Sequence, residues 1–414
     1  MPIFSSRLAL VPQILTPQKG SLVGRALIAR RVACLEGKGM AVEWARELAH
    51  GRTGLIRLET ADPSFDTPAH IIAAAKQALE RGHTHYTDFQ GSLELREAIA
   101  DKLQAEAGVA YDPASEILVT GGTAESIYIA AQGVIDPGDE VMLTDPTYLI
   151  FEPNVVLAGG TVVWVPLVEQ QGWALDVEAL KDKVGARTRV ILLNSPNNPT
   201  GSVLSRAELE QVAEVALRYD LIVIFDLLFD KLVFPGTVME NIASIPGMKE
   251  RTVLLGGFSK VYSMCGFRVG WLAADAELVS WLTNTLHLYV SICANPVAQE
   301  AAVAALRGPQ EWLTDWLGSY QRRRDRLVGA LNRIAGIQCQ LPRGGYFAFP
   351  DVSAIEPNAY RFAERLIDET GVVVTPGPDY GPQGQGHVRM VFGAASEEEV
   401  GEAAARMQKA LPFR

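Results

Sequence analysis

The chain has 414 residues, of which 48% are hydrophobic and 21% are charged, and it contains 37 Gly and 23 Pro. This profile excludes a disordered or fibrous protein and favours a globular protein with two domains. The net charge of -11, without a block of Lys or Arg, argues against nucleic acid as the main partner and favours small-molecule ligands.

The cysteines and the apolar segments indicate a protein that is neither secreted nor embedded in a membrane. The four cysteines lie far apart and include no Cys-x-x-Cys pair. This spacing indicates neither a disulfide framework nor a metal site, so we expect a reducing compartment, the cytoplasm. No stretch reaches the roughly 18 uninterrupted apolar residues of a membrane span. Arg7 and Pro12 interrupt the apolar run that a signal peptide would keep.

The N-terminal segment allows two interpretations. Residues 1–35 contain five basic residues, and no acidic residue comes before Glu36. This charge bias is typical of a transit peptide. The other interpretation is an N-terminal arm, residues 1–19, that packs on a partner subunit.

From Glu116 onward, short β-rich runs alternate with helical patterns. The seven predicted strands are 116–120, 140–144, 161–167, 189–194, 221–226, 252–258 and 268–274. Helices are predicted at 123–134 and 205–219, among others. This alternation predicts an α/β fold with a mainly parallel sheet that is covered on both faces.

The C-terminal part has a different pattern. Helices are predicted at 295–307 and at 312–334, and the second is long enough to link two lobes. Short β-rich runs then alternate with helices at 358–370 and 396–411, which predicts a smaller α+β domain. Open α/β sheets bind their ligands at the carboxyl ends of the strands, so we looked there for functional residues.

The first strand-end loop could approach a phosphate. Strand 116–120 passes through Gly121 and Gly122 directly into a helix, whose positive N-terminal end attracts anions. The same glycines also occur in ordinary tight turns. Their spacing matches neither a dinucleotide fingerprint nor a Walker loop, which disfavours both ligand classes.

Three further strand ends carry polar side chains. Strand 189–194 runs into residues 195–201, a turn with prolines and a glycine that can fix the direction of Asn198. Strand 221–226 ends in Asp226, whose partner could be a structural arginine or a protonated heterocycle. Strand 252–258 is followed by Lys260, and Arg268 comes eight residues later. A lysine at a strand end, taken alone, is more often a surface charge.

Together these elements resemble the class I/II aminotransferases, which are fold type I pyridoxal-phosphate enzymes, over residues 61–392. The resemblance implies a mainly parallel seven-stranded sheet in a large domain, residues 66–312, and a small α+β domain, residues 20–65 and 313–414. It implies pyridoxal phosphate as cofactor, an α-amino acid and a 2-oxo acid as substrates, and a homodimer with shared active sites.

The resemblance also implies roles for individual residues. Lys260 would hold the cofactor as the internal aldimine and then act as general base and acid. Asp226 would keep the pyridine nitrogen protonated, so that the cofactor can accept electrons from Cα. Tyr148 would stack on the ring, and Asn198 would hold its phenolic oxygen.

Two other groups of residues follow from the same resemblance. Arg389 would bind the substrate α-carboxylate in a two-pronged pair, next to Asn198 and Ala61. The residues expected around the cofactor phosphate are Gly122, Thr123, Ala124, Ser259, Arg268 and, from the neighbouring subunit, Tyr86.

Three positions depart from the family pattern. Phe229 replaces a tyrosine that donates to the phenolic oxygen, Gly257 replaces a serine that binds the phosphate, and Ala61 replaces a glycine. These changes leave a second interpretation open, in which the chain is another kind of pyridoxal-phosphate enzyme. Such an enzyme would catalyse elimination, replacement, cyclisation, carbon–carbon bond formation or oxidation. A non-catalytic ligand-binding protein is a third possibility.

The sequence does not identify the side chain of the amino-acid substrate that donates the amino group. We expect it to meet loop residues around Glu59, Thr60, Phe89 and Tyr346.

Overall fold

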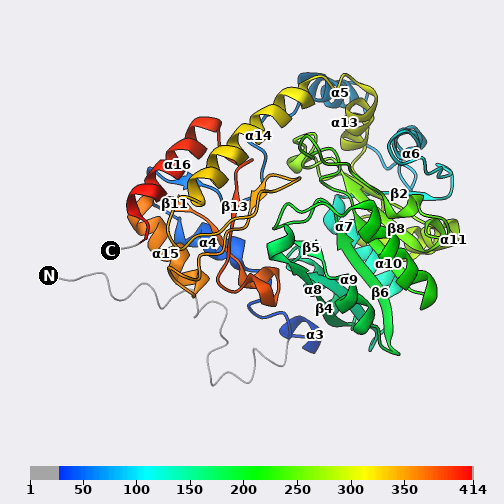
Figure 1. The fold of residues 1–414 in the computed structure, drawn as a ribbon. Coiled ribbons are helices and arrows are strands. Elements are labelled where there is room, and N and C mark those ends of the chain that lie inside the picture. The colour runs from blue at the N-terminus through cyan, green and yellow to red at the C-terminus, as the bar shows by residue number, and fades with distance from the viewer. Residues whose placement is uncertain (1–27, 413–414) are drawn as a thin grey trace.

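The structure is a computed structural model that describes residues 28–412 (Figure 1). The expected arm, residues 1–19, and most of the basic segment 1–35 lie outside the described residues. Among residues 28–412, no helix is both long enough and apolar enough to cross a membrane.

A mainly parallel sheet forms the centre of the molecule, as expected. The strand order is β2-β9-β8-β7-β6-β3-β4-β5. Neighbours from β8 to β4 pair in parallel, whereas β9 is antiparallel to both β2 and β8. The strands are β2 (Ile117–Thr120), β3 (Glu140–Asp145), β4 (Thr161–Val168), β5 (Ala174–Leu175), β6 (Thr188–Asn194), β7 (Ile222–Asp226), β8 (Thr252–Gly257) and β9 (Gly270–Ala273).

The sheet has eight strands, one more than the seven expected. The additional strand is β5, which pairs antiparallel with β4 through only two residues, Leu175 with Leu167 and Ala174 with Val168. A strand of two residues is too short to show an alternating pattern in the sequence. The expectation of seven strands was therefore one too low.

Helices cover both faces of the sheet, because side chains alternate between the faces along each strand. One face packs on α7 (Thr123–Val134), α8 (Phe151–Leu157) and α11 (Ala276–Leu282), and the other on α6 (Leu93–Ala107) and α10 (Arg206–Arg218). Ser205 caps α10 and forms a capping box with Glu208. Side chains on the first face include Leu118, Val141, Leu192 and Leu272, and on the second Val119, Met142, Leu193 and Trp271.

The second part of the molecule joins segments from both ends of the described chain. β1 (Ile56–Arg57) pairs in parallel with β11 (Val372–Val373). β13 (Val388–Val391) pairs with β10 (Phe347–Ala348) and β12 (Thr375–Pro376). The helices of this part are α4 (Ala41–Leu48), α15 (Ala359–Thr370) and α16 (Glu397–Ala410); the short α3 (Arg30–Ala33) lies near α8.

The long helix α14 (Trp312–Leu331) connects the two parts. It runs from the region of α5 (Ala69–Glu80) and α13 (Pro296–Arg307) to α16, against which it packs (Figure 1). On these contacts we propose that the division expected from the sequence holds for the described residues, with a large domain of residues 66–312 and a small domain of residues 28–65 and 313–412.

Candidate active site

A cavity of about 220 Å³ lies where the carboxyl ends of β6 and β7 face the small part of the molecule. It brings together eight residues that the sequence analysis singled out: Thr60, Ala61, Tyr148, Asn198, Asp226, Phe229, Lys260 and Arg389. Its other lining residues are Val42, Leu149, Asn194, Pro196 and Leu228.

Asp226 is a buried carboxylate without a cation. It ends β7, its residue is 4% exposed, and its Oδ1 accepts a hydrogen bond from the Leu228 N–H at 2.9 Å. No ion pair joins it to another residue within 28–412. Burial raises the pKa of Asp226 to about 7, although the Leu228 N–H lowers it. A cationic group in the cavity would therefore be strongly favoured beside Asp226.

The amine of Lys260 lies against the loop of Ala61. Lys260 Nζ donates to the Ala61 carbonyl at 2.5 Å and lies 3.5 Å from Cys265 Sγ. The Tyr346 hydroxyl donates to the same carbonyl at 3.2 Å. Burial raises the pKa of the Cys265 thiol, while the charge of Lys260 opposes this shift. The amine thus rests on a carbonyl and a neutral thiol, from which it can move into the cavity.

Arg389 is held in a fixed direction at the other side of the cavity. It lies on β13 and is 2% exposed. Its Nη1 donates to Asn198 Oδ1 at 3.1 Å, and its Nη2 donates to the Glu59 carbonyl at 2.7 Å. The guanidinium also lies 5.1 Å from the Tyr380 ring centre. Its Nε is buried and has no hydrogen-bond partner among residues 28–412. The two bonds use only two of the five guanidinium N–H groups, so donors remain available to a ligand.

The loop expected at the phosphate forms a tight cradle. Gly122, with a φ of 111°, caps the N-terminus of α7, which begins with Thr123 and Ala124. A Cβ on Gly122 would lie 2.6 Å from Arg268 Nη2, so the guanidinium packs directly on this glycine. Ser259 is buried near the same end of the sheet, and its carbonyl accepts a hydrogen bond from Cys265 Sγ at 3.1 Å.

The structure gives a reason for the glycine at position 257. A Cβ there would lie 2.3 Å from Thr123 Oγ1, which donates to the Gly256 carbonyl at 3.0 Å. The hydroxyl of Thr123 therefore occupies the space that a larger residue at 257 would need.

Tyr86 and Phe89 lie away from the cavity of their own subunit. Tyr86 is 76% exposed and is not among the cavity's lining residues. Phe89 instead lines an open surface groove of about 550 Å³ together with Thr87 and Asp88. The expectation that Phe89 meets the donor side chain is therefore wrong for the site of its own subunit. Thr60 does line the cavity.

Several cavity residues carried no recognisable signal in the sequence. Val42 comes from α4, far along the chain from the motifs, and Leu149 follows an expected residue, Tyr148. Cys265 does not line the cavity but contacts Lys260 Nζ, and its position five residues after Lys260 is the only sequence feature that links the two.

The family comparison covers most of the chain. The model of the family described as aminotransferase class I and II matches residues 53–407. The chain is 37% identical to aromatic-amino-acid aminotransferase 2 of Thermococcus litoralis, over 88% of this chain and 94% of that protein. It is 36% identical to the aspartate aminotransferase of Pyrococcus abyssi, again over 88% and 94%.

Solved structures give the same picture. The aromatic aminotransferase from Pyrococcus horikoshii superposes with a TM-score of 0.84 at 35% identity, covering 89% of this chain and 98% of that one. The aspartate aminotransferase from Rhizobium meliloti superposes with a TM-score of 0.87 at 32% identity, covering 92% and 98%. The fold is therefore shared over nearly the whole chain.

Proposed function

The chain belongs to the class I and II aminotransferases, which depend on pyridoxal phosphate, and we propose that its amino donor is an α-amino acid with an uncharged, largely apolar side chain. The proposal rests on the cavity-lining residues that neither the cofactor nor the substrate α-carboxylate would contact.

The residues of the cavity fit the cofactor. Asp226 is buried without a cationic partner, and a protonated ring nitrogen would supply one. The cradle at Gly122, with Arg268 packed on it, provides N–H groups and a positive charge for a phosphate. When bound, pyridoxal phosphate supplies an electron sink for the pair of electrons released at the substrate Cα.

Lys260 is proposed as the residue that binds the cofactor covalently and moves the proton. Within residues 28–412 its amine donates to a carbonyl and lies near a thiol, so it can leave Ala61 and reach the substrate Cα. Tyr148 lines the cavity, where it can stack on an aromatic ring, and Asn198 can donate to an oxygen there. Thr123, Ala124 and Ser259 complete the proposed phosphate site.

Arg389 is proposed to bind the substrate α-carboxylate. Its guanidinium is buried, and its Nε–H has no hydrogen-bond partner in the described part of the chain. Asn198 and the Glu59 carbonyl fix its orientation, so little conformational freedom is lost when a carboxylate binds. Ala61, which lines the same cavity, is proposed as a further residue of the substrate site.

The remaining lining favours an uncharged donor side chain. Val42, Leu149 and Phe229 are apolar, and Lys260 and Arg389 are the only cationic residues among the described lining residues. A side-chain carboxylate would need a second cation to offset its loss of hydration. The two relatives at similar identity are named for aromatic amino acids and for aspartate, so the cavity, and not the comparison, supports this choice.

We also propose a homodimer that shares its active sites. Tyr86 is largely exposed and does not line the cavity of its own subunit, which leaves its side chain accessible to a partner's phosphate site. Exposed apolar residues also gather after α11: Tyr289 is 83% exposed and Val290 is 53% exposed. Such residues are typical of an interface.

The cytoplasm is the proposed location. All four cysteines are free, including the exposed Cys34, and free thiols are typical of a reducing compartment. Cell fractionation would contradict this proposal by finding the protein outside the cytoplasm.

A donor panel tests the function. The holoenzyme receives phenylalanine, leucine, aspartate or arginine without an oxo acid, and the 2-oxo acid formed is quantified together with the cofactor absorbance. We expect kcat/KM for phenylalanine or leucine to exceed that for aspartate about tenfold or more, a difference of about 1.4 kcal/mol. Equal or faster reaction with aspartate would refute the donor class. Product without conversion of the cofactor to its amine form would refute transamination.

A pair of variants makes this test specific to the cavity. Val42→Arg adds a cation to the lining and should shift the preference toward aspartate. Val238→Arg adds the same charge at a residue that is 70% exposed and does not line the cavity. This control should leave the preference unchanged.

A further inference from the structure

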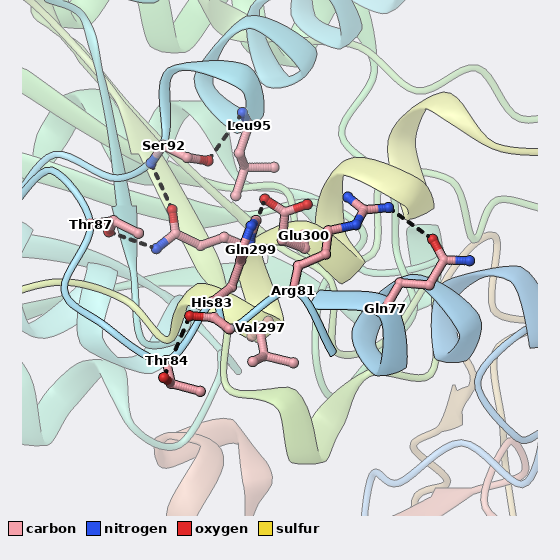
Figure 2. Close-up of polar contacts among 12 residues, drawn as sticks. Gln77, Arg81, His83, Thr84, Thr87, Ser92, Leu95, Val297, Gln299 and Glu300 are labelled. Atoms are coloured by element: carbon pink, nitrogen blue, oxygen red, sulfur yellow. Dashed lines mark hydrogen bonds and ion pairs between the residues drawn. The ribbon is translucent and has the colours of Figure 1, made fainter. Parts of the chain in front are cut away.

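The segment that carries Tyr86 is an exposed loop between α5 and α6. His85 and Tyr86 are exposed, whereas Thr87 is half-buried and begins the part of the loop that returns to the protein. Figure 2 shows the side chains that hold this loop, which come from α13. The conformation of the loop therefore depends on a few contacts that lie outside the cavity.

Gln299 makes the central contacts. It is 1% exposed, and its Oε1 accepts a hydrogen bond from the Ser92 N–H at 2.7 Å. Its Nε2 donates to Thr87 Oγ1 at 3.0 Å and to the Ala294 carbonyl at 2.8 Å. Both donors of the amide and one of its acceptor positions are thus used. One buried side chain fixes the loop directly after Tyr86 and at the start of α6 (Figure 2).

The next residue of α13, Glu300, contacts the loop before Tyr86. Glu300 Oε1 lies 3.3 Å from His83 Nδ1, three residues before the tyrosine. This pair is partly exposed and is expected to contribute less than the buried amide. Tyr86 therefore lies between two anchors that belong to adjacent residues of one helix.

Gln299 also holds a second exposed segment. Its bond to the Ala294 carbonyl joins it to the turn that follows Tyr289 and Val290. The two segments that carry these exposed aromatic and apolar residues therefore share one buried anchor.

We infer that Gln299 is a positioning residue for the active site of the partner subunit, because it holds the loop from which Tyr86 projects. The inference rests on the proposed homodimer with shared sites. Gln299 itself touches neither the cavity nor the cradle of its own chain.

Loss of this anchor should weaken cofactor binding through the conformation of the loop. The apparent dissociation constant rises as the fraction of molecules with a competent loop falls. If that fraction falls to about a tenth, the dissociation constant for pyridoxal phosphate rises about tenfold. The value of kcat at saturating cofactor should change much less, because Lys260, Asp226 and Arg389 keep their contacts.

Four variants separate this effect from general damage. Gln299→Glu keeps the size of the side chain but removes the donor to Thr87 and Ala294. Thr87→Val removes the acceptor at a half-buried position, so it remains informative where the first variant folds poorly. Gln310→Glu is the matched control. Gln310 lies just beyond the end of the same helix, and its Nε2 likewise makes two hydrogen bonds, to the carbonyls of Ala305 and Gly308. Tyr86→Phe reports on the shared site itself.

Hybrid dimers show which subunit is affected. One chain carries Lys260→Ala, so only the other chain can form the absorbance band of lysine-bound cofactor. Each variant is placed either on the Lys260→Ala chain or on the intact chain, and the band is titrated with pyridoxal phosphate. We expect Gln299→Glu and Thr87→Val to weaken binding about tenfold on the Lys260→Ala chain and little on the intact chain. Hydrogen exchange of residues 84–92 should accelerate in both variants and not in Gln310→Glu.

The outcomes distinguish the inference from the proposed function. Suppose that Tyr86→Phe on the Lys260→Ala chain weakens cofactor binding, but Gln299→Glu and Thr87→Val on that chain do not. The role of Gln299 is then refuted, and the shared site stands. If Tyr86→Phe acts only from the intact chain, or the protein is a monomer, the shared site is refuted and the inference falls with it. If Gln310→Glu weakens binding equally, the effect is general destabilisation and the inference is overturned.

Discussion

Asp226 should make the stability of the cofactor-free protein depend on pH. Its pKa is 3.8 in an unfolded chain and about 7 in the folded protein, where burial raises it. Because the folded state keeps the proton longer, this residue favours folding most at low pH. The contribution is lost as pH rises from 3.8 through 7 and is constant above. A shift of about three units corresponds to about 4 kcal/mol.

The perturbation is Asp226→Asn, which removes the buried charge and keeps the size of the side chain. Urea unfolding of the cofactor-free variant and the wild type at pH 5, 6, 7 and 8 gives the difference in unfolding free energy. We expect this difference to grow with pH in favour of the variant and to level off above pH 7, with up to about 4 kcal/mol between the two ends of the titration. Pyridoxal phosphate should reverse the order, because its ring nitrogen would be the missing cation.

A second buried carboxylate provides the comparison. Burial raises the pKa of Asp145 to about 6, against the effect of the Gln383 N–H, so the same series on Asp145→Asn should level off about one pH unit earlier. A difference between wild type and Asp226→Asn that stays constant from pH 5 to 8 would refute the reasoning, because the carboxylate would then titrate alike in both states.

Three further predictions concern the phosphate, the ring oxygen and the backbone. Arg268→Gln should raise the dissociation constant for pyridoxal phosphate about 10- to 100-fold, the effect of losing a charged hydrogen bond of about 1.5–3 kcal/mol, and Arg268→Lys should restore part of the affinity; absorbance titration of the cofactor-free protein measures both. Phe229→Tyr, which adds a donor at a residue lining the cavity, should lower the pH at which the bound cofactor changes colour, and a spectroscopic pH titration that shows no shift would contradict this. Gly381→Ala should destabilise the protein by about 1–3 kcal/mol in thermal unfolding, because Gly381 has a φ of 125° and a Cβ there would lie 2.4 Å from Asp145 Oδ1; an unchanged Tm would contradict it.

Much of the fold could be predicted because its signals are local. β7 is a run of apolar residues that ends in Asp226. The capping residues Ser205 and Glu208 indicate the start of α10. Parallel strands place their carboxyl ends at one edge of the sheet. Motifs that follow separate strands therefore meet there, which is how Asn198, Asp226 and Lys260 come to line one cavity.

The rest depends on packing between distant segments. Val42 reaches the cavity only because α4 packs on the C-terminal part of the chain, and nothing in its neighbouring sequence indicates this position. From the sequence, Gly257 is interpreted as the loss of a phosphate-binding serine. In the structure, Thr123 Oγ1 fills the space that a side chain at position 257 would need. The sequence alone cannot show that these two positions belong together.

Phe229 and Ala61, the other two departures from the family pattern, are also connected in space. The Phe229 ring lies 5.3 Å from the Tyr346 ring in an edge-to-face arrangement, and the Tyr346 hydroxyl donates to the Ala61 carbonyl, which also accepts from Lys260. A hydroxyl added at Phe229 would enter this packed group. The effects of Phe229→Tyr and Ala61→Gly on the pH of the colour change should therefore be non-additive, whereas the effects of two independent sequence changes would add.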